Sequence, residues 1–242
     1  RAQIDYFLDE PLELGSLPLV KYLSRLLHLP VSDFARQDVV RTLSSPFFNK
    51  AFLDLSSSEI EEIDDQSLST LTVKGSADWH WALKLGKLIE RLSLPGIHAS
   101  GYEKTLTDHV SFVEDLIDDL LVLPNDEEFS NPLVSWEEHQ ALFEFRRVLA
   151  NLVLEETLLA HAYGPQMSSY PAFFKRLERA LENANFRRPK VSREAITVCS
   201  ADLVPSRGFK VIIVAGVNEG EGPRRSEEGG FLSKDEVRKW MS

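Results

Sequence analysis

Apolar residues recur at helical spacing along most of this chain, and that periodicity constrains the fold more than any other feature of the sequence. The clearest case follows Pro18, where apolar side chains at positions 19, 22, 23, 26 and 27 fall on one face of a helix. The same spacing predicts further helices over about 33–43, 76–92, 106–121, 136–163 and 171–184. The expected caps are Asp33, Ser76 or Asp78, Ser135 with Glu138 as a capping box, and Ser168 or Ser169.

The periodicity changes near residue 190. Ala195–Ser200 is typical of a strand, and Phe209–Gly216 is typical of a second strand that is apolar on both faces. Too few residues separate the two for a helical crossover between adjacent parallel strands. We expect them to pair as an extended hairpin, or one of them to pair with strands that this chain does not contain. A capping-box pattern at Ser233 and Glu236 predicts a terminal helix through Trp240.

Composition narrows the class of protein. The chain has 242 residues, of which 43% are hydrophobic, so it can bury a sizeable core. No apolar run reaches about 18 residues and no secretory signal is visible, so we expect no membrane span and a cytoplasmic protein. Cys199 is the only cysteine, which excludes a disulfide framework and a cysteine-ligated metal site. Because the sequence does not begin with Met, we expect it to start inside a longer polypeptide.

Two groups of carboxylates suggest a metal site or acid–base chemistry as one hypothesis. The first is the acidic segment from Glu59 to Asp65, and the second consists of Glu114, Asp115, Asp118 and Asp119. Neither group is accompanied by histidines at metal-binding spacing, and the second follows the polar phase of an amphipathic helix. Solvated helix or turn surfaces are the favoured interpretation of both groups, and the sequence predicts no metal site.

A basic strip lies at the end of the predicted helical part, and two interpretations of it have equal weight. Contact with phosphate groups is the functional one. The other is an ordinary basic face directed at solvent or at an acidic partner. The net charge of −11 speaks against a free-standing DNA-binding module but not against a local strip. The strip consists of Lys175, Arg176, Arg179, Arg187, Arg188, Lys190 and Arg193.

The stretch from Ile196 to Pro223 carries a family resemblance. It is similar to the fifth-motif region of UvrD-like superfamily-one DNA helicases, where a strand leads into a loop, a second apolar strand and a glycine-containing turn. Ser200, Asp202, Pro205 and Ser206 stand where that family has Thr, His, Lys and Gly. Such eroded motifs resemble the AddB-type members, which are subunits of ATP-dependent helicase-nucleases. The positions that fit the motif are Phe209, Gly216, Gly220 and Pro223.

The N-terminal part supports the same resemblance. Ile4–Leu8, Pro18–Val20 and Val39–Phe48 are similar, in this order, to the entry into the helical insertion of these helicases. The resemblance implies a mainly α fold with a small β element (α+β), in which a helical insertion domain is attached to part of a RecA-like second helicase domain. The N-terminal strand and the two C-terminal strands are expected to meet in one β element. The implied parts are an entry strand and loop over 1–17, the helical insertion over 18–190 and a C-terminal β/α segment over 191–242.

The resemblance also implies a role in DNA repair or recombination, but without catalytic residues in this chain. No Gly-x-x-x-x-Gly-Lys-Ser/Thr phosphate loop occurs, so we expect no ATPase activity and no bound cofactor here. ATP and magnesium are expected only in the full-length parent or its partner. The expected partners are single-stranded or duplex DNA, reached through the parent protein, and a helicase-nuclease partner subunit. The alternative is a helical protein–protein interaction module with no nucleic-acid role. The candidate DNA-contacting residues are Ser200, Arg187, Arg188, Lys190, Arg193 and Arg207.

Overall fold

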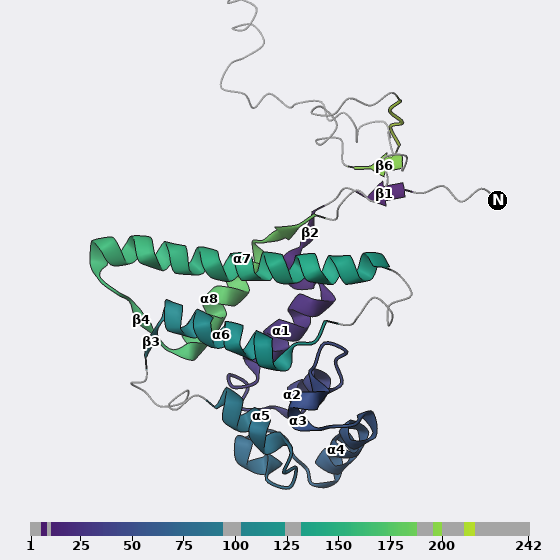
Figure 1. Cartoon of the computed structure of the whole chain (residues 1–242), viewed down its shortest axis with the longest axis vertical. Coiled ribbons are helices and arrows are strands. Elements are labelled where there is room, and N and C mark those ends of the chain that lie inside the picture. The colour runs from purple at the N-terminus through teal and green to yellow at the C-terminus, as the bar shows by residue number, and fades with distance from the viewer. Residues whose placement is uncertain are drawn as a thin grey trace, which may run out of the picture. The chain divides into compact units, whose positions relative to one another are not determined.

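The structure is a computed structural model that describes residues 6–8, 11–93, 103–123, 132–187, 196–199 and 211–215. The chain divides into two compact units, Arg1–Val198 and Cys199–Ser242. The first unit contains the described helices, which agrees with the predicted mainly α class (Figure 1). The RecA-like attachment and the boundaries 1–17, 18–190 and 191–242 remain predictions.

The helices follow one another with short connections. In chain order they are the 3-10 helix η1 (Leu14–Ser16), α1 (Pro18–His28), α2 (Arg36–Leu43), α3 (Lys50–Leu53), α4 (Ser57–Ser69), the 3-10 helix η2 (Ser76–Trp79), α5 (Leu85–Leu92), α6 (Leu106–Leu120), α7 (Pro132–Tyr163) and α8 (Tyr170–Glu182).

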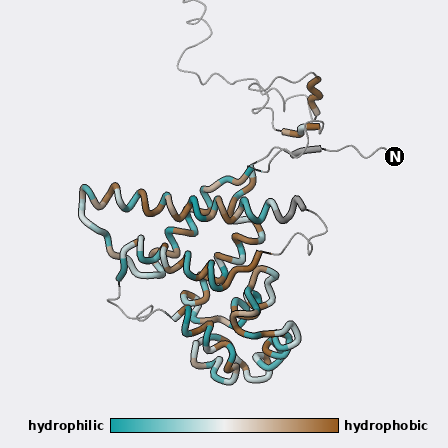
Figure 2. Tube along the Cα trace, in the orientation of Figure 1, coloured by the Kyte–Doolittle hydropathy of each residue, from teal (hydrophilic) through white to brown (hydrophobic). Residues whose placement is uncertain are grey.

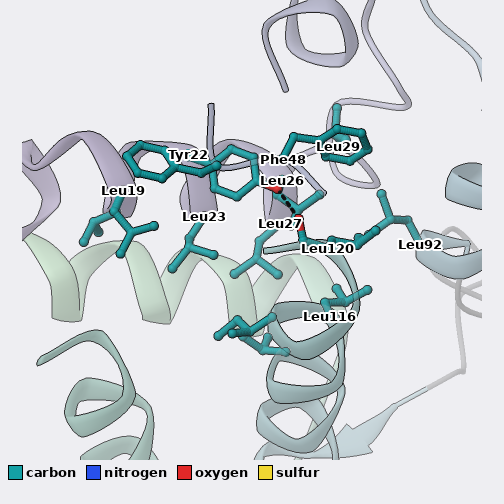
Figure 3. Packing of buried hydrophobic residues seen from close by; sticks show 14 of the residues in the cluster. Leu19, Tyr22, Leu23, Leu26, Leu27, Leu29, Phe48, Leu92, Leu116 and Leu120 are labelled. Atoms are coloured by element: carbon teal, nitrogen blue, oxygen red, sulfur yellow. Dashed lines mark hydrogen bonds between the residues drawn. The ribbon is translucent and has the colours of Figure 1, made fainter. Parts of the chain in front are cut away.

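Helix α1 lies at the centre of the core, because its predicted apolar face is buried against α6, α7 and α8. Leu19 and Leu26 are fully buried, and Leu116 of α6 lies in the same cluster (Figure 3). The Tyr22 hydroxyl donates to the carbonyl oxygen of Leu120 at 2.8 Å. That bond satisfies a carbonyl at the end of α6, where helices leave acceptors unpaired. Sequence periodicity and burial agree here, as they do for α6 and α8.

Helices α2 to α5 form a second lobe, called the distal lobe below (Figure 1). Its anchor is Trp79, which is buried and donates from Nε1 to the carbonyl oxygen of Phe34 at 2.9 Å. Asp33 and Phe34 have φ values of 54° and 53°, so both lie in the left-handed region. The prediction that Asp33 caps a helix is therefore wrong, because the chain turns there and α2 begins at Arg36.

The prediction of one continuous helix over 76–92 is also wrong. The chain forms η2, then a turn, and only then α5. The indoles of Trp79 and Trp81 pack against each other with ring centroids 5.8 Å apart, and Leu83 is left 87% exposed. The tertiary contact of the buried Trp79 indole with the carbonyl of Phe34 overrides the local helical spacing.

The start of α7 differs from the predicted capping box at Ser135 and Glu138. The helix begins at Pro132, which can occupy a first turn because its missing N–H has no partner there. Glu138 consequently lies inside the helix, buried, and accepts a hydrogen bond from the backbone N–H of Leu19. Because the helix begins at Pro132, Glu138 does not cap α7 and instead forms a contact between α7 and α1.

Short strand pairs connect segments far apart in the sequence. Strand β1 (Tyr6–Leu8) pairs in parallel with β6 (Ile196–Val198), with Phe7 opposite Thr197. Strand β2 (Leu12–Glu13) pairs antiparallel with β5 (Asn185–Phe186), and β3 (Lys104–Thr105) pairs antiparallel with β4 (Met167–Ser168). The predicted meeting of the N-terminal strand with the first C-terminal strand is thus confirmed.

The second C-terminal strand, expected over Phe209–Gly216, is not formed in its described part. Val211–Ala215 has no regular structure, and Val211 and Ile213 are 77% and 85% exposed. Figure 2 shows this stretch as a continuous apolar segment. A strand that is apolar on both faces needs neighbours on both faces, and the described residues provide none for it. The predicted terminal helix from Ser233 to Trp240 lies outside the described residues.

None of the helices in the described ranges combines the length and the apolar character that a membrane span requires.

Candidate nucleic-acid interface

The candidate site begins where the chain enters and leaves the helical unit. The two strand pairs β1–β6 and β2–β5 hold the segment before α1 beside the segment after α8. We call these four strands the neck. Because residues 187–195 connect β5 to β6, both ends of the basic connection are fixed by pairing with N-terminal strands. The neck therefore fixes the positions of the two ends of the basic segment between β5 and β6.

Helix α8 reaches the neck through its last turn. The backbone N–H of Leu14 donates to the carbonyl oxygen of Ala184 at 2.8 Å, just after α8 ends. Leu181 is buried beside η1, where a Cβ on Gly15 would lie 3.9 Å from it. Phe186 of β5 is also buried. These contacts fix the outward face of α8 relative to the neck.

The described basic residues differ in their availability. Lys175 and Arg179 are exposed and lie four residues apart on α8, so they share one face. Arg176 donates to Glu155 of α7 at 2.9 Å, which neutralises much of its charge and links the two helices. Arg187 is exposed directly after β5. Lys175, Arg179 and Arg187 are thus the described cations of the strip that are open to a phosphate.

The other predicted contact residues fall outside the described part of the chain. The same holds for the positions that fit the helicase motif. They are Arg188, Lys190, Arg193, Ser200, Arg207, Phe209, Gly216, Gly220 and Pro223.

The carboxylates on α6 serve mainly to join helices. Arg146 of α7 donates to Glu114 at 2.9 Å and to Asp118 at 3.2 Å, and Arg91 of α5 donates to Asp119 at 2.8 Å. The acidic segment after Ser56 is the regular helix α4, opened by a capping box. No group of metal-binding side chains gathers among the residues that the structure describes. These carboxylates therefore act as structural charges in the described part of the chain.

Three buried polar side chains were not recognised from the sequence. Glu156 of α7 accepts from the backbone N–H groups of Leu106 and Thr107 at 3.1 and 3.3 Å, so it caps α6 from a neighbouring helix. His109 is stacked on Phe173 with centroids 5.0 Å apart, and burial lowers its pKa. Burial raises the pKa of Glu138 to about 7, against the hydrogen bond from Leu19. All three depend on contacts between distant segments, for which the sequence holds no local signal.

The arrangement suits charge-based binding of a phosphate backbone. Exposed lysine and arginine side chains on a rigid helix attract phosphates at any base sequence, because the contact carries no base information. Glu178 and Glu182 are exposed on the same face of α8, three residues after Lys175 and Arg179, so they weaken the attraction of this face for phosphate. Among the described residues, the site is therefore limited to the three exposed cations Lys175, Arg179 and Arg187.

Comparison with known proteins gives a partial match. An ATP-dependent helicase/deoxyribonuclease subunit of Lysinibacillus sphaericus (strain C3-41) is 30% identical to this chain over 115 residues. The matched stretch covers 48% of this chain and only 9% of that protein. No protein-family model matches the chain.

Proposed function

We propose that this chain is part of a subunit of an ATP-dependent helicase/deoxyribonuclease, in which it contributes contacts to DNA or to a partner subunit rather than catalysis. The observation that carries the proposal is the parallel pairing of Tyr6–Leu8 with Ile196–Val198 across the whole helical unit. The match to a helicase/deoxyribonuclease subunit supports the same assignment.

The strand pairing is the topology expected of an inserted domain. A domain inserted into another leaves it and returns at neighbouring points, so its first and last segments lie side by side. Two parallel strands alone are too small a sheet to be stable, and parallel sheets are normally covered on both faces. We infer that β1 and β6 belong to a larger sheet, for which a RecA-like domain of the parent is the candidate.

The proposed DNA contacts lie along the basic strip. Lys175 and Arg179 offer exposed charges on α8, and Arg187 continues them past β5. Arg188, Lys190 and Arg193 follow in the connection to β6, and Ser200 and Arg207 are the candidates in the motif-like loop. ATP and magnesium would be bound elsewhere in the parent or by its partner, and the nuclease and helicase activities belong to that assembly.

Single-strand DNA binding by charge-reversed protein tests this proposal. The variant replaces Arg187, Arg188, Lys190 and Arg193 with Glu, and fluorescence anisotropy measures its affinity for a labelled oligonucleotide. The matched control reverses Lys21, Arg41, Lys74 and Lys87, which are exposed and change the net charge equally. We expect the strip variant alone to lose most of its affinity. Equal losses in both variants, or no loss, would exclude DNA contact through the strip.

A second function is favoured by a different surface. Helix α7 carries apolar side chains on its solvent side, with Phe143, Leu154 and Leu158 exposed by 60%, 58% and 64% at a spacing that puts them on one face. Exposed apolar patches of this kind are typical of protein–protein contacts. If the DNA test fails, a helical interaction module that docks through α7 becomes the leading interpretation.

A further inference from the structure

The distal lobe contains a groove that the proposed function does not use. It lies between α4 and the turn over residues 81–84, and its cavity volume is about 220 Å³. Its floor is apolar and is formed by Leu55, Ile63 and Ala82, which are buried, and by the indole of Trp81. We call this cavity the α4 groove.

The walls of the α4 groove are held in place by polar contacts. The ammonium group of Lys84 donates to Glu59 at 2.7 Å and to the carbonyl oxygen of Asp54 at 2.5 Å. The indole Nε1 of Trp81 donates to the hydroxyl of Thr72 at 3.2 Å. A ligand would therefore meet a cavity that is already shaped, which reduces the entropy lost on binding.

The rim of the groove combines an apolar side chain with negative charge. Leu83 stands 87% exposed at the edge, where binding of a partner would cover it. Glu62 is exposed on the same rim, whereas Glu61 and Asp65, which are also exposed, fall on the side of α4 away from the groove. Helix α4 contains no lysine or arginine, and the ammonium group of Lys84 forms a salt bridge with Glu59.

The size of the groove limits what it can hold. Pockets for small molecules usually measure roughly 300–1,000 Å³, so this one is too small for most cofactors. It has room for one large side chain, and interfaces gain most of their affinity from such single anchors in pockets. The negative rim repels nucleic acid and attracts a cationic segment.

We propose that the α4 groove binds a peptide segment of a partner protein in which one large apolar side chain is flanked by lysine or arginine. The apolar side chain enters between Ile63 and Trp81 and covers Leu83, while a flanking cation faces the carboxylate of Glu62. This inference does not depend on DNA binding, because the groove and the basic strip share no residue.

A defined peptide tests the proposal. The probe is a fluorescein-labelled peptide with one tryptophan between two pairs of lysines in a glycine–serine context, titrated with the full chain by anisotropy. One comparison peptide carries alanine at the centre, and another carries glutamates in place of the lysines. Only the first peptide should bind at concentrations below about 1 mM.

Two surface variants locate the binding to the groove. Leu83→Ser should weaken binding about tenfold, because it removes apolar surface that the peptide covers. Glu62→Lys should weaken it roughly fivefold, because an attraction becomes a repulsion. The matched controls are Leu158→Ser on α7 and Glu178→Lys on α8, which make the same changes at exposed positions elsewhere. The proposal is overturned if the probe does not bind, if the comparison peptides bind equally well, or if the controls weaken binding as much as the groove variants.

Discussion

Replacing Glu138 with Gln should stabilise this protein at alkaline pH and leave its stability nearly unchanged in acid. The Glu138 carboxyl group is buried between α7 and the start of α1, and one of its oxygens has no hydrogen-bond partner among the described residues. Burial raises its pKa from 4.5 to about 7, while the N–H of Leu19 opposes the shift and the charge of Glu137 adds to it.

The raised pKa fixes the sign of the effect. Between pH 4.5 and about pH 7 the folded protein binds more protons at Glu138 than the unfolded chain does. The contribution of the group to stability is therefore present in acid and is lost as the pH rises through about 7. Full conversion of the shift gives an upper bound of roughly 3 kcal/mol. Solvent near the helix junction screens the carboxylate, so we expect about 1–2 kcal/mol.

Urea unfolding at pH 5 and pH 8, followed by circular dichroism, measures this difference. The free energy of unfolding of Glu138→Gln should exceed that of the parent chain by under about 0.5 kcal/mol at pH 5 and by about 1–2 kcal/mol at pH 8. Glu178→Gln, an exposed change on α8, should have no such pH-dependent effect. If Glu138→Gln destabilises the protein at pH 8, the charged hydrogen bond to the N-terminus of α1 outweighs burial, and the reasoning is refuted.

Two further predictions concern buried polar contacts. Glu156→Ala should lower the free energy of unfolding by about 2–4 kcal/mol, because the N–H groups of Leu106 and Thr107 lose their acceptor. Its control is the exposed neighbour change Glu155→Ala, which should alter the free energy of unfolding by under about 1 kcal/mol. Trp79→Phe should lower the free energy of unfolding by about 1–3 kcal/mol, because the carbonyl of Phe34 loses its donor and the buried ring shrinks. Calorimetry measures both effects. If either buried variant is as stable as the parent chain, the contact assigned to that residue is contradicted.

The sequence predicts the helices best where one apolar face meets one core. In α1, α6 and α8 the apolar positions at helical spacing are the buried ones, because each helix packs against neighbours along its whole length. The turn at Asp33 and the break after Trp79 could not be predicted in this way, since both depend on an indole that bonds a distant carbonyl. For α7 a usable signal was present, because proline at position 132 is typical of a first helical turn.

The candidate site is less accessible to sequence reasoning. The strip could be recognised by its charge, but the neutralisation of Arg176 depends on Glu155, which lies 21 residues away on another helix. The strand at Ile196–Val198 was predicted from its composition, and its partner at Tyr6–Leu8 from the family resemblance. The α4 groove had no sequence signal, since it forms only when the turn over 81–84 folds against α4.

Disulfide trapping across β1 and β6 tests the central claim that the two ends of the helical unit meet as neighbouring strands. With Cys199 replaced by Ser, cysteines at the partner positions Phe7 and Thr197 lie one strand spacing apart, about 5 Å, which a disulfide can bridge. Cysteines at Tyr6 and Val198 are out of register and about 8 Å apart, beyond that reach. We predict that the first pair forms a disulfide under mild oxidation, seen as a mobility shift on non-reducing gels, and that the second pair does not. Absence of a disulfide in the first pair, or equal yields in both, would contradict the inserted topology.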